Sequence, residues 1–579
     1  MDILPSSFLQ KYSSSSPPLL IQFKPPSARI NINNCKATPS KSSIGKTLHN
    51  SKESKNIITG KRNQSSVVNF FNSLDDLICR FIDPPLRPTV DPNIVLAGNF
   101  SPVAELPPTA CDVVEGALPS CLDGAYIRNG PNPQFVPRGP HHLFDGDGML
   151  HCVRISNGGA TFCSRFVKTY KYTVEREIGS SIFINYFSAF TSFPAALARG
   201  AIVLGRVMSG QYDLYRGNGT ASTSVACFGG KLFALGESDL PYRIKLASDG
   251  DIITLGRHED YGEPLHQMTA HPKIDKETGE AFVFRHNLQR PFLTYFRVDP
   301  DGIKQPEVNI FSKNRSSLVH DFAITRNYAV FPDSQIAIRP AEIIKGNQPV
   351  IVDPTKVPRL GIIPRYAADE REMWWVEVPG FNIIHAVNAW EEDGGDTIVM
   401  VAPNLLAVEN LLDRPELIHS SMERLEINVK AKTVTRRPIA TRSLDFGVIN
   451  PGNVGKKTRY IYATVASGGV KMTAVVKLDL SIPSAEFGDC TVASRQYGPN
   501  SYSGEPCFVP REPDNPTAEE DDGYLVTYVH NEATQESKFL VMDAKSPNLD
   551  IVATVKMPQR VPYGFHGTFV RECDLQKLY

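Results

Sequence analysis

Four histidines in this chain share one kind of sequence surroundings. His271 lies in "QMTAHPKID", His320 in "SLVHDFAIT", His385 in "FNIIHAVNAWEE" and His566 in "VPYGFHGTFV", each at the edge of an apolar, strand-like run. Most of the 13 histidines stand instead in charged or turn-like stretches. One such histidine alone is more often a buried structural residue, but four in similar surroundings favour a shared metal ion. Imidazole suits zinc, copper, iron and nickel, so these residues do not identify the metal.

The separations between these histidines exclude a local metal motif. They are roughly fifty, sixty-five and one hundred and eighty residues, far wider than the spacing in H-E-x-x-H. Such spacing suits ligands contributed one per blade to a common axis. Four neutral imidazoles with no carboxylate ligand would leave the metal its full positive charge, and an octahedral metal such as iron would keep open positions. The pattern therefore indicates a site that can bind dioxygen.

Three acids stand in similar apolar, strand-like settings. They are Glu237 in "ALGESDLPY", Asp445 in "SLDFGVIN" and Glu505 in "GEPCFVP". Metal-bound histidines usually donate their other ring N–H to a carboxylate or a carbonyl, which fixes the tautomer. Each acid alone reads as a turn or surface residue. As a set, they predict hydrogen-bond acceptors for the ligating histidines.

Composition restricts the fold class and the function class. Charged residues make up 21% of the chain and the formal net charge is -1, which gives no long-range attraction for nucleic acid. The 45 prolines and 41 glycines are spread over most of the chain and separate short β-type runs, so we expect an all-β protein. A propeller is favoured over a large sandwich or barrel, although no literal repeat is present. None of the 10 cysteines forms a C-x-x-C pair, which indicates a reducing compartment.

The N-terminal stretch differs from the rest of the chain. Residues 1–60 are rich in serine, carry about eight Lys and Arg, and contain only Asp2 and Glu53 as acids. Such a stretch is expected to be disordered, and it reads as a plastid transit peptide, with a plain disordered tail as the alternative. Residues 61–90 then predict an amphipathic helix and a linker, because Val67, Phe70 and Leu74 recur on one face and Pro84–Pro85 ends the helix. That helix packs on the main body or lies on a membrane surface.

A second apolar stretch carries no charge from Ile178 to Ala198. Its serines, Asn185 and Pro194 argue against a lipid-exposed transmembrane helix. We expect an apolar helical insertion near 178–210 that dips into a membrane or lines a tunnel mouth, with simple burial as the alternative. The residues expected to form this patch are Phe183, Tyr186, Phe187, Phe190 and Phe193.

From about residue 65 to the C-terminus, the chain resembles the carotenoid cleavage dioxygenases, and most closely their plant type 4 branch. The resemblance is carried by the four histidines, the three acids, "YIRNGPNPQF", "HHLFDGDGMLHCV" and "HAVNAWEE". It implies a seven-bladed β-propeller over residues 91–579 with a helical cap. It also implies one Fe(II) per chain, held by His271, His320, His385 and His566. Glu237, Asp445 and Glu505 would then accept from His320, His385 and His566, with Asp445 standing where many relatives have the longer Glu.

The same resemblance implies a function. The chain would insert O2 into a conjugated C=C bond of a C40 carotenoid such as β-carotene, β-cryptoxanthin or zeaxanthin, at 9,10 (9',10') or at 7,8 (7',8'). It implies a plastid location, in a chloroplast or chromoplast, with peripheral contact to a membrane or plastoglobule. Two alternatives stay open, a 9-cis-epoxycarotenoid dioxygenase and a non-catalytic propeller that binds pigments. A retinoid isomerase is disfavoured by the "RNGPNP" form and the N-terminal leader.

Overall fold

The computed structural model describes residues 53–185, 187–188, 192–263, 265–339, 341–342, 349–467, 471–482 and 488–578, with side chains from Ser66 onward. Contacts divide the chain into Met1–Lys61 and Arg62–Tyr579. Every strand of the described residues belongs to the second unit, and the described part of the first unit consists of the first turns of helix α1. Residues 1–52, which form most of the stretch expected to be disordered, lie outside the described residues.

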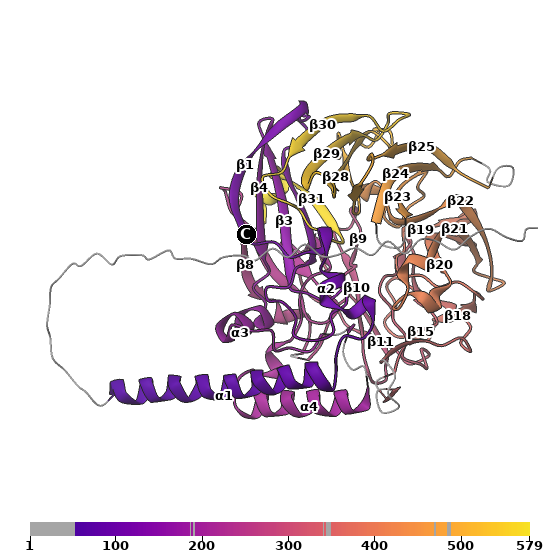
Figure 1. Cartoon of the computed structure of the whole chain (residues 1–579). Coiled ribbons are helices and arrows are strands. Elements are labelled where there is room, and N and C mark those ends of the chain that lie inside the picture. The colour runs from indigo at the N-terminus through magenta and orange to yellow at the C-terminus, as the bar shows by residue number, and fades with distance from the viewer. Residues whose placement is uncertain are drawn as a thin grey trace, which may run out of the picture. The chain divides into compact units, whose positions relative to one another are not determined.

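Antiparallel β-sheets make up most of the second unit (Figure 1). Three four-stranded sheets stand apart in the hydrogen-bond pattern. The first contains β5 (Ser224–Phe228), β6 (Lys231–Leu235), β7 (Tyr242–Leu246) and β8 (Ile252–Arg257). The second contains β9 (Lys273–Ile274), β10 (Ala281–His286), β11 (Leu293–Val298) and β12 (Val308–Ile310). The third contains β13 (Ala323–Ile324), β14 (Tyr328–Asp333), β17 (Arg359–Pro364) and β18 (Trp374–Glu377), and β15 (Ile336–Ile338) pairs separately with β16 (Val350–Val352).

The remaining sheets are joined because two long strands, β22 and β1, each take part in two sheets. β19 (Asn388–Glu392), β20 (Thr397–Leu406), β21 (His419–Asn428) and β22 (Thr433–Val448) form one sheet, and the end of β22 also pairs with β23 (Tyr460–Ser467). The chain continues through β24 (Lys471–Asp479), β25 (Thr491–Gln496), β26 (Ser501–Ser503), β27 (Cys507–Pro510), β28 (Gly523–Asn531), β29 (Glu536–Asp543) and β30 (Ile551–Lys556). β30 pairs with β1 (Leu106–Gly116), which also pairs with β4 (Gly159–Phe166).

The two ends of the β region meet in one sheet. β2 (Gly124–Pro131) pairs with β3 (Gly148–Ser156) on one side and with the C-terminal strand β31 (Gly567–Arg571) on the other. This pairing joins strands from the two ends of the β region in one sheet, as closure of a propeller requires. The all-β prediction is confirmed, and the number of blades stays the expectation of seven.

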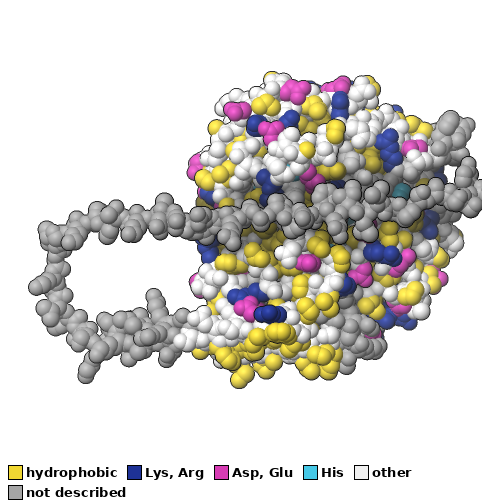
Figure 2. Space-filling view, viewed as in Figure 1, with side chains coloured by type: hydrophobic (Ala, Val, Ile, Leu, Met, Phe, Trp, Pro, Cys, Tyr) yellow, Lys and Arg dark blue, Asp and Glu magenta, His cyan; other side chains and the backbone are white. Residues whose placement is uncertain are grey.

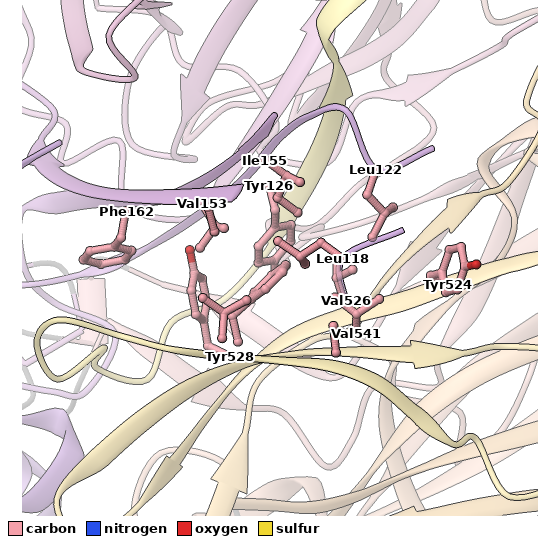
Figure 3. Packing of buried hydrophobic residues seen from close by; sticks show 14 of the residues in the cluster. Leu118, Leu122, Tyr126, Val153, Ile155, Phe162, Tyr524, Val526, Tyr528 and Val541 are labelled. Carbon is pink, nitrogen blue, oxygen red and sulfur yellow. The ribbon is translucent and has the colours of Figure 1, made fainter. Parts of the chain in front are cut away.

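The core lies between the faces of neighbouring sheets. One cluster packs Tyr126 and Val153 from β2 and β3 against Tyr528 from β28 (Figure 3), and it also contains Phe539 from β29. The ring centroids of Tyr126 and Tyr528 lie 5.4 Å apart, and those of Tyr126 and Phe539 lie 5.7 Å apart. Each sheet therefore buries large apolar side chains against the next sheet around the ring.

Few helices accompany the sheets. Among the described residues, the α-helices are α1 (Glu53–Phe81), α2 (Pro92–Val95), α3 (Tyr170–Ile178), α4 (Phe193–Met208) and α6 (Glu572–Leu575). α4 begins where the Ser192 side chain accepts from the Ala195 N–H, with Pro194 in the first turn, and α3 ends at Gly179, whose φ of 77° suits glycine. Helix α4 lies inside the range 178–210 where a helical insertion is expected, whereas α3 ends at Ile178, where that range begins.

Helix α1 begins earlier than the sequence pattern predicts. It starts at Glu53, inside the stretch expected to be disordered, and continues to Phe81 before Pro84–Pro85. Once the amphipathic part has formed, each further residue adds a hydrogen bond without a new nucleation cost. Its C-terminal half packs along α4, where Arg206 donates to Asn72 at 2.9 Å and Arg199 lies 3.4 Å from Asp75.

A buried ion cluster fixes the segment that leads to His320. Asp333, at the end of β14, lies 3.3 Å from the Lys313 ammonium and accepts from Ser317 at 2.6 Å, and it also pairs with Lys356. Burial alone would raise the pKa of Asp333, but the ammonium groups of Lys313 and Lys356 hold it well below its usual range. The ionised carboxylate is therefore part of the folded state.

We expect Asp333→Asn to lower the free energy of unfolding by about 3–5 kcal/mol, because the substitution leaves buried ammonium groups without their counter-charge. A depressed carboxyl pKa contributes stability that is complete above about pH 4 and is lost as the pH falls through the folded-state pKa, so the difference from wild type should shrink in acid. Urea unfolding at several pH values measures it. The exposed pair of Asp369 and Arg371 supplies the control, since Asp369→Asn should change stability by less than about 0.5 kcal/mol. Equal effects of the two variants would contradict this account.

Candidate metal centre

Each of the four histidines lies in a loop immediately before an edge strand of a sheet. His271 precedes β9, His320 precedes β13, His385 precedes β19 and His566 precedes β31. Within the described part of the chain, each of these strands hydrogen-bonds to one neighbour in its sheet. In a propeller the blades surround a central channel. Loops that occupy the same place in different blades can therefore bring residues distant in sequence to one point.

The structure brings the four rings together. One ring nitrogen from each histidine can be chosen so that all four atoms lie within 4.8 Å of one another. The Nε2 atoms of His271 and His320 are 2.9 Å apart, and the ring centroids of His271 and His566 are 4.4 Å apart. A metal with bonds of about 2.1 Å to imidazole nitrogens would separate neighbouring ligands by about 3 Å and opposite ligands by about 4 Å. The four nitrogens fit a single metal ion.

Three of the histidines have a carboxylate on the ring nitrogen that faces away from the cluster. The Nδ1 atom of His320 lies 2.6 Å from Glu237, that of His385 lies 2.9 Å from Asp445, and that of His566 lies 2.9 Å from Glu505. A carboxylate that accepts from Nδ1–H leaves Nε2 deprotonated and free to bind a metal. The structure thus places each acid on the histidine to which the family resemblance assigned it.

His271 is the exception among the four. Among the described residues no carboxylate pairs with its ring, and its backbone N–H donates to Thr269 at 3.0 Å. Burial lowers the pKa of His271 well below its ordinary value of 6.5, and the neighbouring histidine rings lower it further. The ring is therefore neutral at physiological pH, which is the form that binds a metal.

Asp445 reaches its histidine in spite of its short side chain. The pairing of β22 with β23 shifts register between Asp445 and Val448, which is a bulge, and Phe446 has a φ of 50°. Bulges and left-handed backbone at non-glycine residues are found near functional sites, where they redirect a side chain. Burial favours the neutral form of Asp445, but the facing His385 ring and the Phe446 N–H hold the pKa of Asp445 below its usual value.

The ionised carboxylate of Asp445 is the partner that suits a metal ligand, whereas the His385 ring must lose its added proton to bind a metal. Burial opposes the charged form of His385, yet the carboxylate of Asp445 raises the pKa of His385 above 6.5. Asp445 also accepts from the Phe446 N–H at 2.7 Å, so its carboxylate is held from two sides. The result is a fixed negative charge directly behind a ligand, which increases the basicity of the ring.

A large apolar cavity opens onto this cluster. Its volume is about 710 Å³, within the range of small-molecule sites, and three of the four histidine rings line it. The phenylalanines Phe446 and Phe565, which also line it, lie beside the histidines; the centroid of Phe446 is 5.3 Å from that of His385. Sequence reasoning missed these two residues, although each is adjacent in sequence to a residue of the centre, Asp445 or His566. The site can hold a long apolar molecule against the metal.

The expected aromatic patch separates into two parts. Phe183 and Phe187 line the cavity, and Phe187 packs against Phe144 with centroids 5.4 Å apart. Phe193 begins α4 and its side chain is exposed. Tyr186 and Phe190 lie outside the described residues. The patch is thus partly a cavity wall and partly surface.

Helices α1 and α4 expose a row of large apolar side chains, visible as a yellow area over these helices (Figure 2). Leu204 and Met208 of α4 are 60% and 79% exposed, and Phe70 and Leu77 of α1 are 63% and 54% exposed. Contiguous patches of this kind mark interaction surfaces. Among the described residues, no helix is both long and apolar enough to cross a membrane.

Comparison with known proteins agrees with this geometry. Residues 99–571 match the family model described as retinal pigment epithelial membrane protein. Probable carotenoid cleavage dioxygenase 4, chloroplastic, from Arabidopsis thaliana, is 52% identical over 99% of this chain and 97% of its own length. A chloroplastic 9-cis-epoxycarotenoid dioxygenase from Oryza sativa subsp. japonica is 54% identical over 88% of this chain and 81% of its own length.

A solved structure shares the fold. Cobalt-substituted Synechocystis ACO superimposes with a TM-score of 0.67 and 26% identity, covering 83% of this chain and 99% of that chain. The family match spans most of the chain, and the two plant relatives cover it with about half of the positions identical. The chain therefore belongs to the carotenoid oxygenase family and is an oxygenase.

Proposed function

We propose that this chain is a non-haem Fe(II) dioxygenase, with one iron per chain, that cleaves a conjugated C=C bond of a C40 carotenoid. The observation that carries the proposal is the meeting of four histidines with an apolar cavity of about 710 Å³. A centre of neutral nitrogen ligands suits iron and leaves positions open for dioxygen. The cavity suits a long, apolar polyene and excludes water from the reacting bond.

The reaction balances without a proton or a nucleophile from the protein. The double bond breaks, each of its carbons gains one oxygen atom of O2, and two carbonyl products leave. Bound iron supplies the activation of dioxygen in this chemistry. The chain's own residues orient the substrate and the ligands: Phe446 and Phe565 line the cavity beside the histidine rings, and Glu237, Asp445 and Glu505 fix three imidazole tautomers.

The substrate class follows from the cavity and from the relatives. We favour β-carotene, β-cryptoxanthin or zeaxanthin, cleaved at 9,10 (9',10') or 7,8 (7',8'), in line with the relative named carotenoid cleavage dioxygenase 4. A second candidate is a 9-cis-epoxycarotenoid, because a relative with that name is 54% identical. The plastid location rests on the chloroplastic names of both relatives and on the serine-rich leader.

Membrane contact is part of the proposal. Carotenoids dissolve in lipid, so the enzyme must take its substrate from a membrane or a plastoglobule surface. The exposed apolar side chains of α1 and α4 suit shallow insertion into such a surface. Phe183, which lines the cavity, belongs to the segment between α3 and α4 and so connects this surface to the interior.

Incubation of the purified chain with β-carotene, β-cryptoxanthin, zeaxanthin and a 9-cis-epoxycarotenoid under ¹⁸O2 tests the function. We expect two carbonyl products from one of the first three, each with one labelled oxygen, and chromatography gives the cleavage position. Preference for the epoxycarotenoid would support the second candidate. Carotenoid binding without turnover in the iron-loaded chain would support a pigment-binding propeller and refute the enzyme.

Substitutions at the metal centre test the roles of ligand and acid separately. His320→Ala should abolish iron retention, because a ligand is lost. Glu237→Gln should weaken metal affinity by about 10–100-fold, because it leaves the ligand in place and disturbs only its orientation. Iron content after dialysis against a chelator measures both. The exposed histidine His419 is the matched control, and His419→Ala should retain iron as wild type does. Equal iron content in all three variants would contradict the site.

Polar substitutions on α4 test the membrane surface. Leu197 and Leu204 are 59% and 60% exposed, and burying each in lipid is worth about 1–1.5 kcal/mol, so Leu197→Gln with Leu204→Gln should weaken vesicle binding by about tenfold or more. Sedimentation with phosphatidylcholine vesicles measures this, while turnover of detergent-dispersed substrate stays unchanged. Ile253→Gln with Val492→Gln, on strands of the propeller, is the control and should bind vesicles as wild type does. An equal change in vesicle binding in the two double variants would contradict the proposed membrane surface.

A further inference from the structure

One buried carboxylate joins three of the loops that carry the histidines. Asp321 follows His320 directly, and its exposed fraction is 2%. One of its oxygens accepts from the Ala386 N–H at 2.8 Å, and Ala386 follows His385 directly. Its other oxygen lies 2.7 Å from the ammonium of Lys273, two residues after His271. A single side chain thus contacts the loops of three histidines that lie far apart in sequence.

These contacts are close enough to the rings to control them. Consecutive Cα atoms are only about 3.8 Å apart, so a shift of Lys273, Asp321 or Ala386 displaces the neighbouring histidine. Asp321 also accepts from the Phe322 N–H at 2.7 Å, and Lys273 contacts the Ala386 carbonyl at 3.4 Å. The three loops are therefore fixed relative to one another by hydrogen bonds as well as by packing.

The arrangement compensates for the missing acid at His271. The other three histidines are each oriented by a carboxylate on Nδ1, whereas His271 has none among the described residues. The ion pair of Lys273 and Asp321 instead holds the chain two residues after His271. The fourth histidine, His566, is held by other backbone hydrogen bonds. Its carbonyl accepts from the Asn129 N–H at 3.0 Å, and its N–H donates to the Thr223 carbonyl at 3.2 Å.

The charge of Lys273 makes sense only in this role. An ammonium group two residues from a metal ligand repels a divalent cation, so electrostatics alone would select against it. A buried carboxylate such as that of Asp321, however, is costly without a partner, and the Lys273 ammonium lies 2.7 Å from it. The pair is neutral as a whole, which allows Asp321 to hold the loops without a large net charge beside the metal.

We propose that Asp321 and Lys273 are positioning residues that set the placement of His271, His320 and His385 around the shared metal ion. The proposal rests on the proposed function, since it assumes that the four histidines bind one metal. Neither residue belongs to the sequence pattern that identified the histidines and their three acids. Their effect is on metal affinity and ligand geometry, not on a chemical step.

The test uses Co(II), whose visible absorption reports ligand geometry, titrated into the full metal-free chain with a competing chelator. Asp321→Asn and Lys273→Met should each weaken Co(II) affinity by about 10–100-fold, as changes behind a ligand do, and alter the absorption bands. The double variant should bind no more weakly than Asp321→Asn alone, because the two residues act as a unit. Lys273→Arg should restore most of the affinity.

The direction of the change in Co(II) affinity in Lys273→Met distinguishes a positioning role from a purely electrostatic one. Removing a positive charge near a cation site would tighten binding if charge alone mattered, whereas loss of the tie to the His271 loop weakens it. Asp479→Asn is the matched control, since Asp479 is buried, pairs with Arg459 at 2.7 Å and accepts from the Ser481 N–H at 2.9 Å in another sheet. It should leave Co(II) affinity and the absorption bands unchanged.

Thermal unfolding of the metal-free variants shows whether any loss of affinity is a loss of folding. If Asp321→Asn does not fold, Lys273→Met still decides, because the Lys273 side chain is 17% exposed and tolerates replacement more easily. If the wild-type chain binds Co(II) and Lys273→Met binds it as tightly or more tightly, the inference about Asp321 and Lys273 is refuted, while the proposed function stands. Failure of the wild-type chain to bind Co(II) or iron would refute the proposed function as well.

Discussion

The structure depends on one constraint: four imidazole rings must stay neutral, with their lone pairs directed at one point inside a protein. Neutrality is favoured by burial, which lowers the pKa of His271 well below its ordinary value. Direction requires a hydrogen-bond acceptor behind the ring, and three of the rings have a carboxylate there. A ring of sheets satisfies both requirements, because each histidine occupies the same place, the loop before an edge strand.

The charged centre and the apolar cavity impose opposite demands on the same loops. The cavity requires apolar side chains such as Phe446 and Phe565, while the carboxylates behind the rings require partners. The end of strand β22 meets both demands with neighbouring residues: Asp445 contacts His385, and the next residue, Phe446, lines the cavity. The bulge at the end of β22 and the left-handed conformation of Phe446 make this arrangement possible with a short Asp side chain.

The sequence predicted those features whose residue pattern recurs along the chain, and it did not predict those that depend on a single contact between distant residues. The histidines and their three acids could be predicted because each stands in the same apolar setting, and the all-β class because turn residues recur between short runs. The roles of Asp321 and Lys273 could not be predicted from the sequence. An acid and a base near a histidine resemble ordinary surface residues, and only the fold shows that they connect the loops. The aromatic patch was only partly foreseeable, because pattern alone does not separate a cavity wall, such as Phe183, from an exposed side chain, such as Phe193.

X-ray absorption at the iron edge of the iron-loaded wild-type chain tests the central claim most directly. The account predicts a first shell of light atoms at about 2.1 Å, with outer-shell scattering from four imidazole rings and no sulfur ligand. A fit with two or fewer imidazoles would contradict it, and so would a sulfur ligand or a chain that takes up no iron.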